Sequence, residues 1–442
     1  MIDVETGPKQ PVAPRTCEEA GVSEDLVLQL VTKALHFAGE STGVGLANRL
    51  GVPFTVIESS LNLLKRDRQC EIIGGAGSVL GPPSYRYRIT DAGRARASLF
   101  LDHSQYVGHV PVPLVQYAGY MRQFQSEVQI AAKRASVRKA FSKLVLNDRV
   151  LDQLGPAIAS GHSLFIYGPP GNGKTVISQA IRNLYVGELS IPHAIEVEGQ
   201  IIRIFDPVNH EPVSGFNGDG IADQGIGLEV DTIDRRWLQC KRPLVTAGGE
   251  LTLDSLELGF SEAAGFYRAP IQMLANGGVL VIDDFGRQHA TPRDLLNRWI
   301  VPLESRVDYL TLRTGQKFEL PFVVLVVFAT NLRPGDLVDE AFLRRIQYKV
   351  YCESPTVEEF SRIFGDCCEA RGLMYDPGLV HALIETELQP RDVHLRGCQP
   401  RDLIDKALAL ASYLDRPREL SLELLSAACA SYFVDDRDFP DA

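Results

Sequence analysis

The chain changes from an irregular pattern to regular hydrophobic periodicity near residue 21. Residues 1–20 contain three prolines and little periodicity, which predicts a flexible tail. The next segments comprise three apolar runs with helical spacing and two shorter strand-like runs: 23–39, 43–50, 54–66, 70–73 and 85–89. Glycines and prolines separate the two strand-like runs, so we expect a hairpin and, over 21–102, a small α+β domain.

Residues 103–144 are expected to link this domain to the rest of the chain, mainly through one helix near 114–140. Beyond them, five strands are predicted: 163–167, 243–247, 279–282, 322–329 and 347–351. The apolar runs 279–282 and 322–329 have the character of strands buried on both faces, as in a parallel sheet. A helical pattern at 295–306 lies between two of these runs. We therefore expect an α/β domain over 145–353, followed by a helical segment over 354–435.

The composition narrows the class of protein. The 442 residues suffice for two or three domains, and the content of 45% hydrophobic and 23% charged residues is typical of folded globular proteins. The net charge of −11 disfavours a surface devoted to polyphosphate, although it leaves room for a local basic face. The longest apolar run, 322–329, is too short for a membrane span, and residues 1–20 lack a secretory pattern. We expect a cytoplasmic protein with no membrane segment.

Cysteine and histidine usage gives no sign of a metal site. The eight cysteines are scattered without C-x-x-C spacing, and the nine histidines form no H-E-x-x-H cluster. Adjacent Cys367 and Cys368 are poorly placed to join in a disulfide or to share a zinc ion. The sequence predicts reduced thiols and no metal site built from protein ligands alone.

The order of elements in 21–102, three helices and then a hairpin, is that of a winged helix. The stretch 85–94 resembles the second wing strand and the start of the following helix in bacterial winged-helix regulators. Its charge is nearly balanced, with nine Lys and Arg against eight Asp and Glu. Groove-binding modules normally present a clear basic face, and Glu58 falls among the outward positions of the third helix. Protein docking or packing is therefore favoured over DNA binding, and both stay open.

A Walker A loop lies between an apolar strand at 163–167 and a helical pattern. Its residues and the first helical position after them are Gly168, Pro169, Pro170, Gly171, Asn172, Gly173, Lys174, Thr175 and Val176. The glycines allow backbone N–H groups to turn toward phosphate oxygens, and Lys174 supplies a cation to the β- and γ-phosphates. The Thr175 hydroxyl is predicted to coordinate Mg²⁺, so the sequence predicts binding of ATP or GTP with magnesium.

Polar residues follow two of the later buried strands. Asp283 and Asp284 end the run at 279–282, where Asp283 is expected to hold Mg²⁺ and Asp284 to polarise the attacking water. Asn331 follows the run at 322–329 and is expected to orient that water, although a turn residue is the alternative. Arg344 and Arg345 precede a further strand, where they could reach a neighbouring subunit as arginine fingers or serve as surface charges.

These landmarks, in this order, resemble the AAA+ ATPase family. The resemblance implies a five-stranded parallel P-loop core, a helical lid, an ATP site between them, and assembly into a ring that is hexameric by default. Asn331 then matches sensor 1, and Arg401, in the stretch 399–403 that opens an apolar helix, is similar to a sensor 2 arginine. The stretch 340–347 looks like that of Clp-type disaggregases, whose paired arginines complete the neighbour's ATP site.

Within AAA+, the segment 267–278 looks like the MoxR group. Residues 187–242 form an unusually long insertion, expected to contain a hairpin around 198–199 and, by analogy with that group, to meet partners. His210 and Trp237 lie within it, and we expect both to pack rather than to bind a ligand. The aromatic stretch 265–267 corresponds to the channel loop of many ring ATPases, although it would suit a core equally well.

One departure from the family bears on activity. Asp284 stands where the family usually has glutamate, and its side chain is one methylene shorter, so hydrolysis is expected to be slow. The sequence thus predicts an ATPase that remodels or matures an unidentified protein partner. Two alternatives stay open: a DNA-associated ATPase or regulator that uses the winged helix, and a nucleotide-gated scaffold with little hydrolysis.

Overall fold

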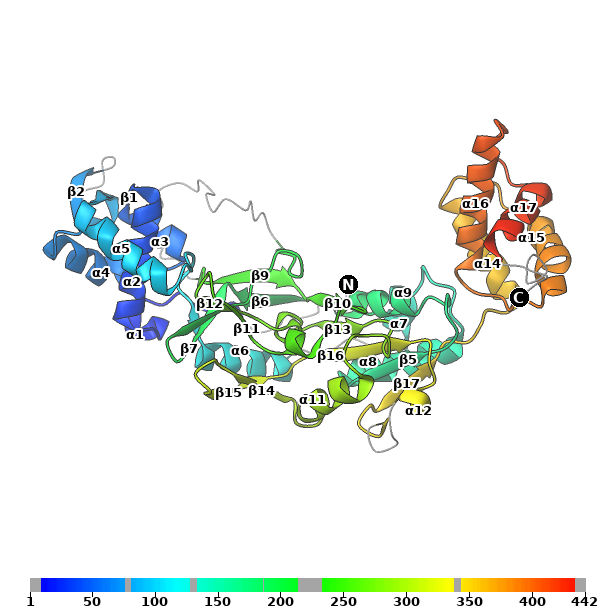
Figure 1. The fold of residues 1–442 in the computed structure, drawn as a ribbon, viewed down its shortest axis with the longest axis horizontal. Helices are drawn as coiled ribbons and strands as arrows, with labels where there is room; N and C mark the ends of the chain where they lie inside the picture. Colours follow the sequence, from blue (N-terminus) through cyan, green and yellow to red (C-terminus); the bar gives the residue numbers. More distant parts are fainter. Residues whose placement is uncertain are drawn as a thin grey trace. The chain divides into compact units, whose positions relative to one another are not determined.

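The computed structural model describes residues 9–75, 81–127, 133–185, 187–213, 233–337 and 343–433. The chain forms two compact units, each assembled from segments distant in sequence (Figure 1). Unit 1 comprises Met1–Ile130, Tyr185–Leu280 and Asn297–Leu325, and unit 2 comprises Ala131–Leu184, Val281–Leu296 and Val326–Ala442. Within the described ranges, no helix is long and apolar enough to cross a membrane.

The first part of unit 1 is the expected α+β arrangement. Its elements are α1 (Cys17–Ala20), α2 (Glu24–Ala38), β1 (Glu40–Thr42), α3 (Gly43–Leu50), α4 (Phe54–Arg66), β2 (Cys70–Gly75), η1 (Pro82–Ser84), β3 (Tyr85–Ile89) and α5 (Asp91–His103). The three predicted helices and the hairpin are confirmed, and β1 is an additional short strand that makes the antiparallel sheet β1-β3-β2. The flexible tail predicted over 1–20 is wrong at its end, because Cys17–Ala20 form α1, where the Thr16 side chain accepts the Glu19 N–H. The Ser23 hydroxyl accepts the Leu26 N–H and so caps α2, whose apolar stripe enters a shared core.

The single linker helix predicted near 114–140 is wrong. The structure has α6 (Leu114–Glu127) and α7 (Arg134–Ala140), and Lys133 is extended, with φ −64° and ψ 147°, so α7 begins anew after it. Residues 128–132 lie outside the described part. Because Tyr117, Met121 and Phe124 of α6 are buried in the core of unit 1, α6 is a packing element and not a linker.

The inserted segment supplies two strands, β7 and β8, of a second five-stranded sheet in unit 1, with strand order β11-β12-β8-β7-β4. The strands of this sheet are β4 (Val112–Pro113), β7 (Ala194–Val197), β8 (Gln200–Arg203), β11 (Gly259–Ser261) and β12 (Phe266–Arg268). The predicted hairpin is confirmed: β7 and β8 pair antiparallel, and Glu198 and Gly199 turn the chain with φ of 50° and 77°. Two further antiparallel pairs are β6 (Glu188–Pro192) with β9 (Trp237–Lys241) and β14 (Val307–Thr311) with β15 (Lys317–Pro321).

The α/β core contains the predicted five-stranded parallel sheet, with strand order β10-β13-β16-β5-β17. Its strands are β5 (Leu164–Tyr167), β10 (Leu244–Ala247), β13 (Val279–Ile282), β16 (Leu325–Thr330) and β17 (Tyr348–Tyr351). The first strand of the sheet in sequence, β5, pairs parallel with both β16 and β17. Strands β10, β13 and β16 therefore lie on one side of β5 and β17 lies on the other, which makes this a topological switch point. Ligands of open parallel sheets bind at such switch points, outside the carboxyl ends of the strands.

Helices complete the two units. Those associated with the α/β core are α8 (Asp148–Ser160), α9 (Lys174–Ala180), η2 (Ile181–Leu184), η3 (Leu253–Leu256), α10 (Ile271–Leu274), α11 (Pro292–Ser305) and α12 (Pro334–Leu337). The carboxy-terminal helical segment, which we call the lid, has α14 (Val357–Glu369), α15 (Pro377–Leu383), η4 (Ile384–Leu388), η5 (Gln389–Arg391), α16 (Gln399–Tyr413) and α17 (Leu422–Tyr432). The lid has its own apolar core, and Thr356 with Glu359 forms a capping box at the start of α14.

Candidate nucleotide site

The Walker A loop joins β5 to α9, as predicted. Gly168 has a φ of 147°, and a Cβ there would lie 2.3 Å from the Cys352 carbonyl oxygen, so no larger residue fits without a shift of the backbone. Gly173 has a φ of 74° and starts α9 in the left-handed conformation. The two glycines let the loop turn tightly between strand and helix, which leaves its backbone N–H groups available to an anion.

Lys174 is held inside this loop. Its ammonium group donates to the carbonyl oxygens of Gly168 and Pro169, at 3.0 and 2.7 Å, and only 7% of the residue is exposed. Burial lowers the pKa of Lys174 from its ordinary value, and the nearby Asp283 and Asp284 carboxylates oppose that change. The two carbonyls satisfy the cation where it lies, and a phosphate oxygen would make a stronger partner because it carries charge.

Thr175 and Asp283, which are 108 residues apart in sequence, meet at the predicted magnesium position. The Thr175 hydroxyl donates to Oδ2 of Asp283 at 2.6 Å, and Oδ1 of Asp283 accepts the Asp284 N–H at 3.0 Å. A hydroxyl beside a carboxylate provides the oxygen ligands that Mg²⁺ prefers, and one or two such ligands suffice when phosphates supply others. The donor set therefore fits magnesium.

The turn after β13 places Asp284 toward Asn331. Asp284 has a φ of 48°, and its Oδ1 accepts a hydrogen bond from Asn331 Nδ2 at 3.2 Å. Gln288, which the sequence did not single out, fixes this turn: its Nε2 donates to the Asp283 and Asp284 carbonyls, and its Oε1 accepts the Gly286 N–H. An uncommon backbone conformation held in this way is typical of functional sites.

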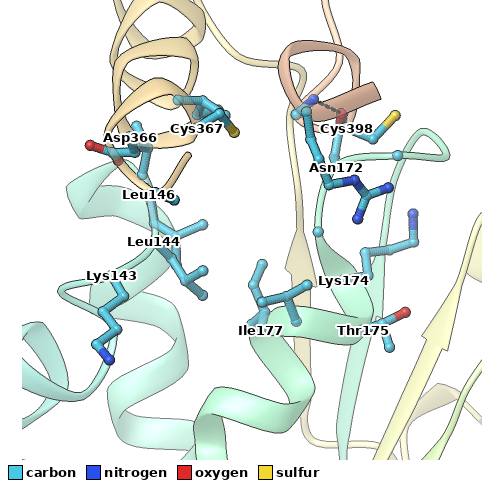
Figure 2. A pocket seen from close by; sticks show the side chains of 18 of the residues that line it. Lys143, Leu144, Leu146, Asn172, Lys174, Thr175, Ile177, Asp366, Cys367 and Cys398 are labelled. Atoms are coloured by element: carbon cyan, nitrogen blue, oxygen red, sulfur yellow. Dashed lines mark hydrogen bonds between the residues drawn. The ribbon is translucent and has the colours of Figure 1, made fainter. Parts of the chain in front are cut away.

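These residues line a cavity of about 630 Å³ within unit 2. Its lining comprises Lys143, Leu144, Val145, Leu146, Gly171, Asn172, Gly173, Lys174, Thr175, Val176, Ile177, Asp283, Asp284, Asn331, Ile363, Asp366, Cys367, Ala370, Arg371, Gly397, Cys398 and Arg401. In Figure 2, Lys174 and Thr175 lie on one side, Ile177 lies next along the cavity, and Leu144 and Leu146 lie opposite. The cavity thus has a cationic, polar end and an apolar end, and its volume is within the range of small-molecule sites.

The lid contributes the predicted Arg401 and an unpredicted arginine. Arg401 lines the cavity, but its guanidinium pairs with Asp402 at 2.8 Å, and 61% of its side chain is exposed. Arg396 donates to the Pro170 carbonyl at 2.9 Å, so it contacts the Walker A loop directly. Asn172 bonds to two further backbone groups, donating to the Glu353 carbonyl and accepting the Gly397 N–H. Sequence spacing could not reveal Arg396, because this contact joins residues 226 positions apart.

Arg344 and Arg345 do not line the cavity. Arg344 is exposed and Arg345 is half-buried, and the Ser163 hydroxyl donates to the Arg345 carbonyl at 3.4 Å. The stretch 338–342, which includes part of the Clp-like motif, lies outside the described residues. The structure thus leaves the role of both arginines at the neighbour's site a prediction.

The aromatic stretch 265–267, which suits either a channel loop or a core, belongs to the core of unit 1. Phe266 and Tyr267 belong to β12, and Tyr267 is 2% exposed, with its hydroxyl accepting the Arg313 N–H at 2.9 Å. An aromatic residue at the start of a strand suits either setting, and here the core of unit 1 holds it. His210 and Trp237 are buried as expected, and His210 Nε2 lies 2.8 Å from the Leu274 carbonyl oxygen.

Comparisons with known proteins agree with this geometry. Residues 141–207 match the family model of magnesium chelatase, subunit ChlI, and residues 356–431, in the lid, match a domain of unknown function (DUF8689). The ChlI match begins before the Walker A loop and includes it. Together with that loop and the strand order, it decides the fold. The α/β core has the AAA+ P-loop fold.

Two solved structures illustrate what the chain is similar to among known folds. The Thermotoga maritima RuvB Holliday junction branch migration motor aligns at a TM-score of 0.37 and 13% identity, covering 70% of this chain and 72% of that one. NtrX from Brucella abortus aligns at a TM-score of 0.39 and 16% identity, covering 72% of this chain and 62% of that one. A comparison with curated proteins found no match.

Proposed function

We propose that this chain binds ATP with Mg²⁺ and hydrolyses it. The observation that carries the proposal is the 2.6 Å bond between Thr175 and Asp283 at the polar end of a 630 Å³ cavity, next to Lys174. Few sites other than those for nucleotides combine a phosphate-binding loop, a cation and a magnesium pair with an apolar compartment. The match to the ChlI model over 141–207 supports the same activity.

We expect ATP to bind in one orientation, with its triphosphate at the Lys174 end of the cavity and its base at the apolar end. The triphosphate would take the place of the Gly168 and Pro169 carbonyls as partner of the Lys174 ammonium, with Thr175 and Asp283 holding the metal. Bound Mg²⁺ would neutralise charge on the β- and γ-phosphates. The base would then lie in the apolar compartment near Leu144 and Leu146, which Figure 2 shows opposite Lys174.

In this proposal Asp284 accepts a proton from the attacking water, and Asn331 orients that water. Their side chains are hydrogen-bonded at 3.2 Å, so a water between them and a γ-phosphate would contact both. Because the side chain of Asp284 is one methylene shorter than that of glutamate, its carboxylate would lie further from that water, and turnover should be slow.

We infer further that the chain works as a homo-oligomeric ring, hexameric as in MoxR-like AAA+ proteins. Arg344 and Arg345 lie outside the chain's own cavity, which is what an arginine finger for a neighbour requires. Arg401 lines the cavity from the lid, where a sensor 2 arginine acts. Arg344 and Arg345 of each subunit would then contact the nucleotide bound by its neighbour.

The work output we propose is remodelling of a protein partner. The arginines of the wing-like strand β3 are matched by acids: Arg86 pairs with Glu40, and Arg88 lies 3.2 Å from Glu40 and 3.9 Å from Glu71. A DNA-binding wing needs such arginines for phosphates, so their pairing favours a protein partner over duplex DNA.

The test is ATP binding and phosphate release by the purified chain. Lys174→Ala should weaken ATP binding by about 100-fold, because a charged contact to phosphate is lost. Asp284→Asn should keep binding and lower phosphate release about 100-fold. Lys139→Ala, on α7 and outside the cavity lining, is the matched control and should change neither quantity. Wild-type chain that binds no ATP would refute the proposal.

A further inference from the structure

The turn after β13 holds Asp284 in an uncommon backbone conformation. Its φ of 48° lies in the left-handed region, where a residue with a side chain stays only when its surroundings hold it there. Gly286, two positions further on, also has a positive φ, of 104°. The contacts that hold this turn therefore decide where the Asp284 carboxylate lies.

The sheet fixes the peptide group that follows Asp284. The Phe285 N–H, which belongs to that group, donates to the Ala329 carbonyl at 2.7 Å. The Thr330 hydroxyl donates to the Phe285 carbonyl at 2.6 Å, and the Phe285 side chain is fully buried, whereas Asp284 is exposed. The end of the turn is thus anchored to β16.

The Gln288 amide joins the peptide group before Asp284 to the anchored one. Its Nε2 donates to the Asp283 carbonyl at 2.8 Å and to the Asp284 carbonyl at 3.2 Å, and its Oε1 accepts the Gly286 N–H at 2.8 Å. The φ and ψ angles of Asp284 are the rotations between these two peptide groups, so an amide bonded to both carbonyls limits both angles. Only a side chain that donates and accepts can make all three bonds.

Gln288 is placed to act through Asp284 and not on the nucleotide. It does not line the cavity, whereas Asp284 and Asn331 do, and their side chains are hydrogen-bonded at 3.2 Å. The Asp283 carboxylate has a separate partner, because the Thr175 hydroxyl donates to it at 2.6 Å. Loss of the Gln288 bonds should therefore disturb the residue beside the attacking water more than the residues that hold the metal.

We propose that Gln288 is a positioning residue for hydrolysis, which keeps the Asp284 carboxylate beside Asn331 by bonding to the carbonyls on both sides of Asp284. The inference rests on the proposed function, because that function assigns Asp284 to the attacking water. Gln288 then sets the rate of the chemical step and contributes little to ATP affinity. A shift of about 1 Å in a catalytic group can cost about 100-fold in rate, so three bonds far from the phosphates can control turnover.

The first test separates rate from affinity. Gln288→Met keeps the length of the side chain and removes the amide, and it should lower single-turnover phosphate release at saturating ATP and Mg²⁺ by about 10- to 100-fold. ATP affinity, measured by calorimetry, should stay within about twofold of the wild-type value. Gln288→Glu keeps the acceptor for Gly286 but loses both donors, so it should be at least as slow. Gln316→Met, at an exposed position between β14 and β15, is the control and should change neither quantity.

The second test asks whether Gln288 works through Asp284. In an Asp284→Asn background the catalytic carboxylate is absent, so adding Gln288→Met should slow phosphate release by less than about twofold more. A contribution to general stability would instead slow both backgrounds by the same factor, because independent effects add in free energy.

The outcomes distinguish this inference from the proposed function. Wild-type rates in Gln288→Met, a loss of ATP affinity as large as the loss of rate, or equal slowing in the two backgrounds would each overturn the role of Gln288 while leaving ATP hydrolysis intact. A wild-type chain that neither binds ATP nor releases phosphate would overturn the proposed function itself.

Discussion

The two units use buried and half-buried polar groups in opposite ways. In unit 1, Arg236 and Asp234 are each 2% exposed, and Arg236 also bonds to the Ala20 carbonyl and to Gln116, so its donors have lasting partners. In unit 2, Lys174 rests on two loop carbonyls, and Thr175 rests on Asp283. The partners in unit 2 are ones that a nucleotide and its metal can replace. We therefore expect the Arg236–Asp234 pair to stabilise the fold and Lys174, Thr175 and Asp283 to bind the nucleotide and its metal.

The largest expected effect on chemistry in unit 2 comes from its paired arginines, Arg344 and Arg345. Arg344→Ala with Arg345→Ala should lower phosphate release about 1,000-fold, because arginine fingers stabilise charge in the transition state. ATP affinity should change by only a few fold, since neither residue lines the chain's own cavity. Mass photometry with and without ATP measures assembly alongside turnover. Nucleotide-driven assembly and turnover that both survive the double change would contradict a role between subunits.

In unit 1, the corresponding change should affect stability and not chemistry. Arg236→Met leaves the Asp234 carboxylate buried without its cation, which should lower the free energy of unfolding by about 3–5 kcal/mol. The control is Arg122→Met, which breaks an exposed pair with Glu319 and should cost at most about 1 kcal/mol. Denaturant unfolding measures both. Equal costs for the two variants would remove the distinction between the units.

The catalytic carboxylate offers a gain of function. Asp284→Glu extends the side chain by one methylene toward the position usual in AAA+ proteins, and phosphate release should rise up to about 100-fold. The control is Asp294→Glu, because Asp294 lies at the exposed start of α11. Asp308→Glu would not serve as a control, because Asp308 is fully buried against Arg298. Steady-state phosphate release decides the matter. A rate that is unchanged or lower in Asp284→Glu would show that this site is built for aspartate.

Acid should weaken unit 1 through two stacked histidines. The rings of His109 and His193 lie 3.7 Å apart, and burial lowers the pKa of His109 from 6.5 to about 4 and that of His193 to about 2. The folded state therefore binds fewer protons than the unfolded state below pH 6.5. The contribution of the two neutral rings to the free energy of unfolding is complete above that pH. It is lost as pH falls toward the pKa values of the folded state, by about 1.4 kcal/mol per pH unit for each ring.

Thermal unfolding between pH 7.5 and 5.5 measures this loss. His193→Gln should flatten the pH dependence, whereas His381→Gln, at an exposed position on α15, should keep it. A pH dependence that is identical in the wild-type chain and His193→Gln would exclude the stacked pair as its source.

How much the sequence could reveal follows from the range of the interactions involved. The Walker A loop and the strand before Asp283 have local signatures, so the site and the strands around it were predictable. Gln288 and Arg396 act on backbone carbonyls, and no residue pattern marks a side chain that will reach a carbonyl. The break before α7 could not be predicted because no proline or glycine marks Lys133, and the setting of Tyr267 stayed open because its local pattern suits both a loop and a core.

The most direct test of the account is the magnesium dependence of ATP binding, because it probes the Thr175–Asp283 pair itself. Calorimetric titration of ATP with and without Mg²⁺ should show tighter binding with the metal in the wild-type chain. Asp283→Asn should lose most of that gain, about tenfold or more in metal affinity. ATP binding that ignores Mg²⁺ in the wild-type chain, or a gain that is intact in Asp283→Asn, would contradict the site proposed for this chain.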